Sequence, residues 1–273
     1  MAEFSKTIGF IGAGRMATAL ARGCVQSKLV PVARLLAADP VPASRQAFSQ
    51  EIAGAEVGES NELVLGRADI VVLAVKPQMM ATVLSEIQSL VTGKHLLVSI
   101  AAGIPLARLA QALPAGTRLI RVMPNTPCLI GEGASCFSRG PTATAEDSQC
   151  VRQILASVGI AHEVPEHLLD AVTGLSGSGP AFLYRVIESM AEGGVVMGIP
   201  PELALELAAK TALGAAKMVL STGKSPVELR EQVTSPGGTT VAGLETLARL
   251  HGAEAFREAV VSATKRSAEL GRG

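Results

Sequence analysis

The sequence of 273 residues has no excess of charge of either sign, because its 24 lysines and arginines are balanced by 24 aspartates and glutamates. No block of basic residues is present either, so nucleic acid and an anionic membrane surface are poor candidates for partners. Long apolar runs are also missing, since uncharged stretches such as residues 70–75 and 96–104 are too short to span a bilayer. The N-terminus lacks the apolar core of a signal peptide. We therefore expect a cytoplasmic protein with no membrane-spanning segment.

The cysteine and histidine spacings that are typical of metal sites are absent as well. The four cysteines include no C-x-x-C pair, and we expect them to be free thiols in a reducing compartment: Cys24, Cys128, Cys136 and Cys150. The four histidines are scattered along the chain, at His95, His162, His167 and His251. We therefore predict no metal site.

A glycine-rich motif close to the N-terminus is the first functional pattern. A short apolar strand is predicted at residues 8–11, and residues 12–17 then read Gly-Ala-Gly-Arg-Met-Ala before a predicted helix. Strand, glycine turn and helix in this order are the context of the dinucleotide-binding fingerprint G-x-G-x-x-G/A. Gly12 would permit the turn, Gly14 would let a pyrophosphate approach the backbone, and Ala17 would let the helix pack close to the strand. An ordinary glycine turn is the alternative.

Asp39 is a candidate for recognising the ribose of such a dinucleotide. It follows the second predicted strand, where an acidic residue usually holds the 2′-hydroxyl of NAD. A carboxylate there would repel the 2′-phosphate of NADP, whereas Ser44 and Arg45 could accept that phosphate. The alternative role of Asp39 is that of a turn residue before Pro40. The preference for NADPH or NADH therefore stays open.

Apolar runs further along the chain predict strands that are buried on both faces of a parallel sheet, at residues 70–75, 96–100 and 118–123. Helical stretches separate these runs, and two weaker strands are expected at residues 134–137 and 161–164. The alternation predicts an α/β fold with a Rossmann-type doubly wound sheet over residues 1–165. Ligands bind at the carboxyl ends of the strands in such sheets. We therefore predict cofactor contacts in the glycine motif and just after the strands: Ile11, Gly12, Ala13, Gly14, Arg15, Met16, Asp39, Ala74, Lys76, Pro77, Ala101 and Gly103.

After Pro165 the composition shifts from strand-like runs to alanine-rich helical periodicity. Residues 166–273 are therefore expected to form an all-helical C-terminal domain. Small residues between positions 204 and 216 would let a helix backbone approach a neighbour closely, in the same chain or in another subunit.

Two glycine-rich stretches interrupt the helical pattern, at residues 173–180 and 234–240. In the second, hydroxyl side chains surround two glycines at a predicted helix start. Hydroxyls and unpaired N–H groups at a helix N-terminus make an anion site that fits a carboxylate. A loop with a helix cap is the alternative.

Five segments together resemble the pyrroline-5-carboxylate reductases: residues 9–17, 74–78, 121–127, 173–182 and 228–240. The last two segments are highly specific to that family, whereas the first is shared with many dehydrogenases. The resemblance implies reduction of 1-pyrroline-5-carboxylate to proline with NADPH or NADH, in the last step of proline biosynthesis. It also implies an interleaved homodimer through the helical domain, often assembled into a decamer as a pentamer of dimers. Asp39 is a departure, since NADPH-preferring members tend to carry a small or basic residue there.

The resemblance also implies site residues. It implies that the cofactor is lined by Asn61, Val75, Lys76 and Ala102. It makes residues 166–273 a domain for substrate binding and dimerisation, in which the loop at residues 235–240 holds the imine. We expect the substrate to contact Ser235, Gly238, Thr239 and Thr240, with the N–H groups of Gly238 and Thr239 and the Ser235 hydroxyl on the carboxylate.

The expected chemistry is consistent with these residue types. Hydride adds to the carbon of the C=N bond, and a cyclic imine can enter already protonated, so a strong general acid is not required. Thr240 is then the catalytic candidate, because its hydroxyl can orient or help to protonate the ring nitrogen.

Two other functions are weighed against this one. The β-hydroxyacid dehydrogenases are similar in architecture and carry a catalytic lysine after a glycine-rich motif, but Leu183 stands at that position here. A non-catalytic NAD(P)-sensing protein is the third candidate, and the carboxylate-type loop counts against it. The residues leave open any regulation by proline and any activity on six-membered imines.

Overall fold

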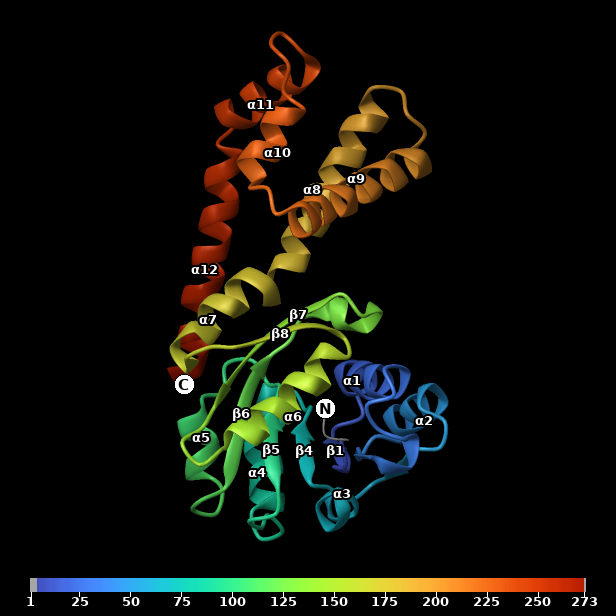
Figure 1. The fold of residues 1–273 in the computed structure, drawn as a ribbon, viewed down its shortest axis with the longest axis vertical. Coiled ribbons are helices and arrows are strands. Elements are labelled where there is room, and N and C mark those ends of the chain that lie inside the picture. Colours follow the sequence, from blue (N-terminus) through green and yellow to red (C-terminus); the bar gives the residue numbers. More distant parts are fainter. Residues whose placement is uncertain (1–3, 273) are drawn as a thin grey trace. The chain divides into compact units, whose positions relative to one another are not determined.

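The computed structural model describes residues 4–272, and its centre is an eight-stranded sheet with the order β3-β2-β1-β4-β5-β6-β7-β8 (Figure 1). The strands are β1 (Ile8–Ile11), β2 (Leu35–Ala38), β3 (Glu56–Gly58), β4 (Ile70–Leu73), β5 (Leu96–Ser99), β6 (Arg118–Met123), β7 (Gly133–Arg139) and β8 (Gly159–Glu163). Neighbouring strands are parallel except for the antiparallel pair β6 and β7. The chain leaves β1 for β2 on one side and later returns to β4 on the other, so the order reverses at β1.

Helices cover both faces of this sheet. One face packs against α1 (Arg15–Gln26), α2 (Pro42–Glu51) and α6 (Ala145–Ala156), and the other packs against α3 (Asn61–Arg67), α4 (Met80–Ile87) and α5 (Leu106–Gln111). Side chains of β1 alternate between the two cores, with Phe10 in the first and Ile11 in the second. Gly9 lets α3 approach the strand, since a Cβ there would lie 2.4 Å from Val64 Cγ1. The predicted doubly wound α/β fold is confirmed.

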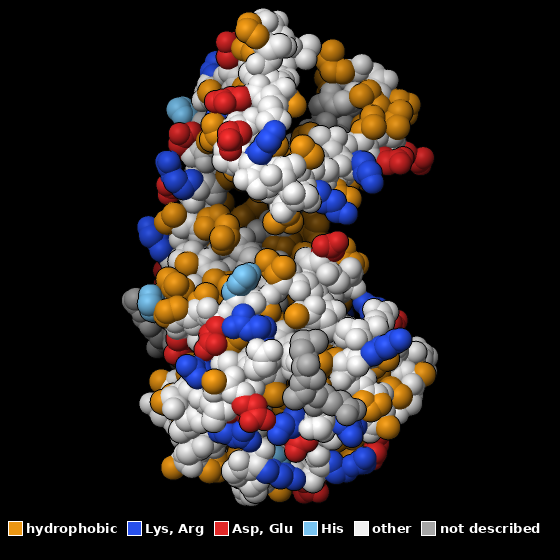
Figure 2. All heavy atoms as spheres, in the orientation of Figure 1, with side chains coloured by type: hydrophobic (Ala, Val, Ile, Leu, Met, Phe, Trp, Pro, Cys, Tyr) orange, Lys and Arg blue, Asp and Glu red, His pale blue; other side chains and the backbone are white. Residues whose placement is uncertain are grey.

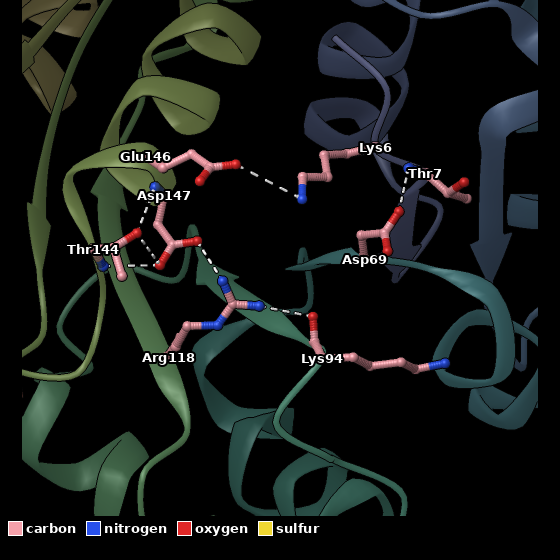
Figure 3. A network of polar contacts seen from close by, with 8 residues as sticks. All are labelled: Lys6, Thr7, Asp69, Lys94, Arg118, Thr144, Glu146 and Asp147. Atoms are coloured by element: carbon pink, nitrogen blue, oxygen red, sulfur yellow. Dashed lines mark hydrogen bonds and ion pairs between the residues drawn. The ribbon is translucent and has the colours of Figure 1, made fainter.

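Charged side chains at the amino ends of the parallel strands bond to one another and to nearby backbone groups (Figure 3). The N–H of Thr7, before β1, donates to Asp69 Oδ2 at 2.8 Å. Arg118 at the start of β6 donates to Asp147 Oδ1 at 2.7 Å and to the carbonyl oxygen of Lys94 at 2.8 Å. Asp147 also closes the capping box at the start of α6. The charged groups shown at the amino edge of the sheet thus already have partners within the protein. The carboxyl edge, where ligands bind in open α/β sheets, is the candidate for ligand binding.

The described chain after β8 contains helices and turns only. These elements are two short turns (Glu166–Leu168 and the π-helical Thr173–Gly177) and the helices α7 (Leu169–Val172), α8 (Gly179–Val196), α9 (Pro201–Thr222), α10 (Pro226–Gln232), α11 (Thr239–Arg249) and α12 (Gly252–Arg272). The chain divides into two compact units: residues 179–261 form one, and the rest, including residues from 262 onward, form the other. The functional boundary expected at residue 165 lies just after β8 and stays a prediction. None of the helices described in residues 4–272 is both long and apolar enough to cross a membrane.

The unit of residues 179–261 has a very small core. Its buried cluster consists of Ala191, Ala204 and Ala208, and the packing of α8 on α9 relies on small residues, since a Cβ at Gly194 would lie 3.3 Å from Ala204 Cβ. Large apolar side chains are instead exposed over its helices, among them Leu183, Val196, Met197, Leu205 and Leu220 (Figure 2). Apolar surface of this extent marks an interaction site. The unit is therefore built to be covered by another chain.

We expect the protein to be a dimer or a larger assembly at micromolar concentration, as measured by analytical ultracentrifugation. Leu205→Glu should raise the monomer fraction, because Leu205 lines an apolar groove of about 930 Å³ along α8 and the start of α9. Ile130→Glu is the matched control, since Ile130 is 78% exposed but belongs to the other unit. A stable, active wild-type monomer would refute the expectation.

His95 is a buried histidine that is held neutral just before β5. Its Nδ1 accepts from the N–H of Thr92 at 2.9 Å, so Nε2 carries the proton and donates to the carbonyl oxygen of Leu65 at 2.9 Å. Burial is the main cause that lowers the pKa of His95 below its usual value. Below about pH 6.5 the unfolded chain therefore binds more protons at this position than the folded chain does.

The free energy of unfolding should consequently fall as the pH drops below about 6.5, the ordinary histidine pKa. His95→Gln should remove this part of the pH dependence, because glutamine does not titrate. Denaturant unfolding at about pH 7.5 and about pH 5.5 tests this, since these values lie on either side of that pKa. Equal pH slopes for wild type and His95→Gln would contradict it.

Candidate functional site

The glycine turn between β1 and α1 has the shape that a dinucleotide requires. Gly12 has φ +95°, and a Cβ there would lie 2.8 Å from the carbonyl oxygen of Ala74, so only glycine fits. Gly14 is the N-cap of α1, has open space beside it, and is followed by no acidic residue in the first turn. No side chain caps α1, so its first N–H groups are available to a phosphate. Ala17 is fully buried, as expected for the packing residue of the motif.

The segments that follow β4 and β5 lie at the same edge of the sheet as the glycine turn, because β1 pairs with β4 and β4 pairs with β5. They contain the predicted residues Ala74, Val75, Lys76 and Pro77, and Ala101, Ala102 and Gly103. Lys76 is exposed, and its ammonium group has no partner within residues 4–272. The structure thus gathers these segments around one edge, next to the reversal of strand order at β1.

The side chain of Asn61, a predicted cofactor residue, has a protein partner in this structure. It is the first residue of α3, and its Nδ2 donates to Glu86 Oε2 at 3.0 Å. Its role toward the cofactor stays a prediction.

The Asp39 carboxylate braces the glycine turn in this structure. Its Oδ2 accepts from the N–H of Ala13 at 2.9 Å, and its Oδ1 accepts from the N–H of Val41 at 2.9 Å. Arg45 lies beside it, donating to the carbonyl oxygens of Asp39 and Pro40 at 2.8 and 3.0 Å. A carboxylate and a guanidinium therefore both lie at the end of β2, where the adenosine ribose is expected.

The loop before α11 combines a tight turn with an uncapped helix start. The N–H of Gly238 donates to the carbonyl oxygen of Ser235 at 3.0 Å, across Pro236 and Gly237, and Gly237 has φ +70°. This is the arrangement of a type II turn. Gly238 is then the N-cap of α11, without a side-chain cap. A Cβ at Gly238 would lie 2.8 Å from Ser235 Oγ and 3.0 Å from the carbonyl oxygen of Ser235, so the turn leaves little room for a side chain there.

The turn changes which donors are available for an anion. We expected the N–H of Gly238 to bind the carboxylate, but that N–H is taken by Ser235. The N–H groups of Thr239 and Thr240 have no acceptor within residues 4–272, and neither do the hydroxyls of Ser235, Thr239 and Thr240. The loop therefore offers two N–H groups and three hydroxyls to an anion. Gly238 leaves space beside them because it has no side chain.

Asn125 is a buried residue that has no predicted role. Its Nδ2 donates to the carbonyl oxygen of Ser176 at 3.0 Å, and its Oδ1 accepts from the N–H of Ala134 at 2.9 Å. Next to it, a Cβ on Gly177 would lie 2.4 Å from Met123 Cε. The polar end of β6 is thus tied to the π-helical turn Thr173–Gly177, a kind of turn that is frequent at functional sites. In the described residues, no group of three or more His, Cys, Asp or Glu is placed to hold a metal ion.

The cofactor preference can be tested at the end of β2. Asp39→Ser should raise kcat/KM for NADPH relative to NADH about tenfold, because the carboxylate repels a 2′-phosphate. Arg45→Gln should shift the ratio the other way. Effects on the shape of the glycine turn are common to both cofactors and cancel in the ratio. An unchanged ratio in Asp39→Ser would mean that Asp39 only braces the turn.

Comparisons with known proteins agree over the whole length. Residues 166–270 match the model of the pyrroline-5-carboxylate reductase dimerisation family, and residues 7–103 match the model of the coenzyme F420-dependent NADP oxidoreductases. The chain is 45% identical to a pyrroline-5-carboxylate reductase of Methanosarcina acetivorans, over 98% of this chain and 99% of the other. It is 46% identical to that of Pisum sativum, over 97% and 96%.

Solved structures show the same likeness. The pyrroline carboxylate reductase of Plasmodium falciparum with NADP bound has a TM-score of 0.88 at 32% identity, over 98% of both chains. The enzyme of Coxiella burnetii has a TM-score of 0.90 at 32% identity, over 97% of this chain and 98% of the other.

Proposed function

The chain belongs to the pyrroline-5-carboxylate reductase family, and we propose that its sheet edge binds the nicotinamide cofactor while the loop at residues 235–240 binds the imine. It is an NAD(P)H-dependent oxidoreductase that reduces 1-pyrroline-5-carboxylate to L-proline by hydride transfer, the last step of proline biosynthesis. The observation that carries the proposed imine site is the set of free donors at the start of α11.

The substrate carboxylate fits these donors. The N–H groups of Thr239 and Thr240 point from a helix N-terminus, whose positive end favours an anion, and the Ser235 hydroxyl adds a third donor. The free Thr240 hydroxyl can then orient the ring nitrogen. The site needs no strong acid, because the imine can enter protonated.

The proposed cofactor site at the carboxyl edge of the sheet has the groups that a dinucleotide requires. The bare backbone at Gly14 leaves room for a pyrophosphate, the uncapped start of α1 supplies N–H groups to it, and Asp39 or Arg45 would meet the adenosine ribose. When bound there, NAD(P)H supplies a hydride to the imine carbon. Lys76, exposed and unpaired in the described chain, would contribute a positive charge near the cofactor.

The helical part makes the protein an oligomer, as the match to a dimerisation family over residues 166–270 and the exposed apolar helices indicate. We propose more specifically a homodimer through this part, with a pentamer of dimers as the larger form. A cytoplasmic location and the division into residues 1–165 and 166–273 stay predictions.

Thr240→Ala and Ser235→Ala separate the two roles of the loop. Thr240→Ala should lower kcat by roughly tenfold to a thousandfold, nearer the low end if the imine arrives protonated. Ser235→Ala should mainly raise the KM for the imine, because it weakens carboxylate binding in the ground state and the transition state alike. Steady-state kinetics with 1-pyrroline-5-carboxylate measures both effects.

Thr246→Ala is the matched control, since Thr246 is an exposed threonine on the same helix. It should behave like wild type. If Thr240→Ala and Ser235→Ala also show wild-type imine kinetics with intact circular dichroism, the loop is only a helix start and the imine binds elsewhere.

A further inference from the structure

A buried arginine, Arg121, stands on β6 beside Ser99, the last residue of β5. The side chain of Arg121, on β6, is 7% exposed, and its guanidinium nitrogens lie 3.3 Å from Glu166 Oε1 and 3.6 Å from Asp170 Oδ1. A buried charge is costly unless it is paired, and here one cation faces two carboxylates. None of these three residues belongs to the predicted cofactor or imine sites. Arg121 therefore holds the carboxylates of Glu166 and Asp170 in place. The other hydrogen bonds of these two carboxylates show which parts of the chain they position.

Glu166 holds one end of the loop that follows β5. Its Oε1 accepts from the N–H of Leu106 at 2.7 Å, and Leu106 is the first residue of α5. The N-cap of α5 is Pro105, which makes no side-chain cap, so the acid comes from a distant part of the chain to satisfy this helix start. The downstream end of the loop at residues 101–105 is thereby fixed.

Asp170 supports the loop at residues 101–105 indirectly, because it binds α12, and α12 packs against the loop. Its Oδ1 accepts from the Ser267 hydroxyl at 2.8 Å, and Ser267 is a buried residue of α12. One turn later α12 packs on the loop, since a Cβ at Gly103 would lie 3.4 Å from Leu270 Cβ, and a Cβ at Gly271 would lie 3.5 Å from the carbonyl oxygen of Gly103. Figure 1 shows the C-terminal end of α12 beside α7, which contains Asp170.

The loop itself has little internal support. The N–H groups of Ala102 and Gly103 have no acceptor within residues 4–272, and Gly103 is buried with φ +72°. Ala101 and Ile104 are buried in the core, and the remaining support for Ala102 and Gly103 comes from the contacts at the two sides of the loop. Both of those contacts lead to an acid that is paired with Arg121.

We propose that Arg121, through Glu166 and Asp170, is a positioning residue that holds residues 101–103 in the shape that binds the nicotinamide cofactor, with Ser267 as the link to α12. This inference rests on the proposed function, because residues 101–103 are part of the proposed cofactor site. Neither Arg121 nor Ser267 needs to touch the cofactor. A loosened loop should weaken cofactor binding and leave the donors of the imine loop unchanged.

Ser267→Ala is the mildest test, because it removes one hydrogen bond and leaves no buried charge without a partner. We expect the Kd for NADPH, measured by isothermal titration calorimetry, to rise about threefold to tenfold. The KM for the imine at saturating NADPH should stay within about twofold of wild type, since the substitution does not change the residues that are proposed to bind the imine. Ser267→Thr keeps the hydroxyl and should restore the wild-type Kd.

Glu269→Gln is the matched control on the same turn of α12. Glu269 pairs with Arg266 at 2.7 Å, and both side chains are exposed. This variant should bind NADPH like wild type. A lowered melting temperature in Ser267→Ala with an unchanged Kd for NADPH would show that the cluster only stabilises the fold, and would overturn the inference.

The same experiment distinguishes failure of this inference from failure of the proposed function. Wild-type protein that binds NADPH and reduces the imine, together with an unaffected Ser267→Ala, refutes the positioning role alone. Wild-type protein that binds neither NADPH nor NADH refutes the proposed function, and the inference with it.

Discussion

The close approach of two backbones at Gly12 is the constraint on which the candidate cofactor site depends. The turn after β1 passes so near the end of β4 that a Cβ at Gly12 would lie 2.8 Å from the carbonyl oxygen of Ala74. The N–H of Gly12 also donates to the carbonyl oxygen of Ala38 at the end of β2. Three parallel strands therefore end around one glycine. This closure brings the uncapped start of α1 to the carboxyl edge of the sheet, where the segments after β4 and β5 also lie.

Both proposed ligand sites use the same physical device. The helices α1 and α11 each begin at a glycine N-cap that supplies no side-chain acceptor, so their first N–H groups are left for a ligand. Three other helices begin with a serine or threonine cap, at Ser60, Thr144 and Ser225, whereas α2, α4, α5, α7 and α9 begin without a side-chain cap but also without a glycine at the N-cap. A bare helix start costs local stability, because a side-chain cap is typically worth about 1 kcal/mol. The missing caps are consistent with an anion that takes their place.

The sequence predicted the fold well because most strands are continuous apolar runs. β7 and β8 contain polar residues and were expected only as weaker strands. No run marks β3, because its three residues Glu56, Val57 and Gly58 include one apolar side chain. The glycine motif and the helix start at α11 could also be predicted, since their chemistry is local. The bond from the Gly238 N–H to Ser235 was not predicted, although Pro236 and Gly237 are the residues that a type II turn favours.

Other features of the site depend on contacts between distant segments, which a single sequence does not reveal. Asn125 meets Ser176, and Arg121 meets Asp170, only because β6 lies beside the turns that follow β8. The amide of Asn61 is bound to Glu86, a residue of the next helix. Such partners follow from the order of strands and the packing of helices on them, rather than from local spacing.

The small core of residues 179–261 has a consequence for how the protein acquires its stability. Three buried alanines contribute little burial energy, since the gain on removing a side chain from water grows with its apolar area. Most of the apolar area of these helices is buried only when another chain covers it, so folding and association of this unit are one event. Its thermal midpoint should therefore depend on protein concentration, and a newly made chain must find a partner before its helical part is stable.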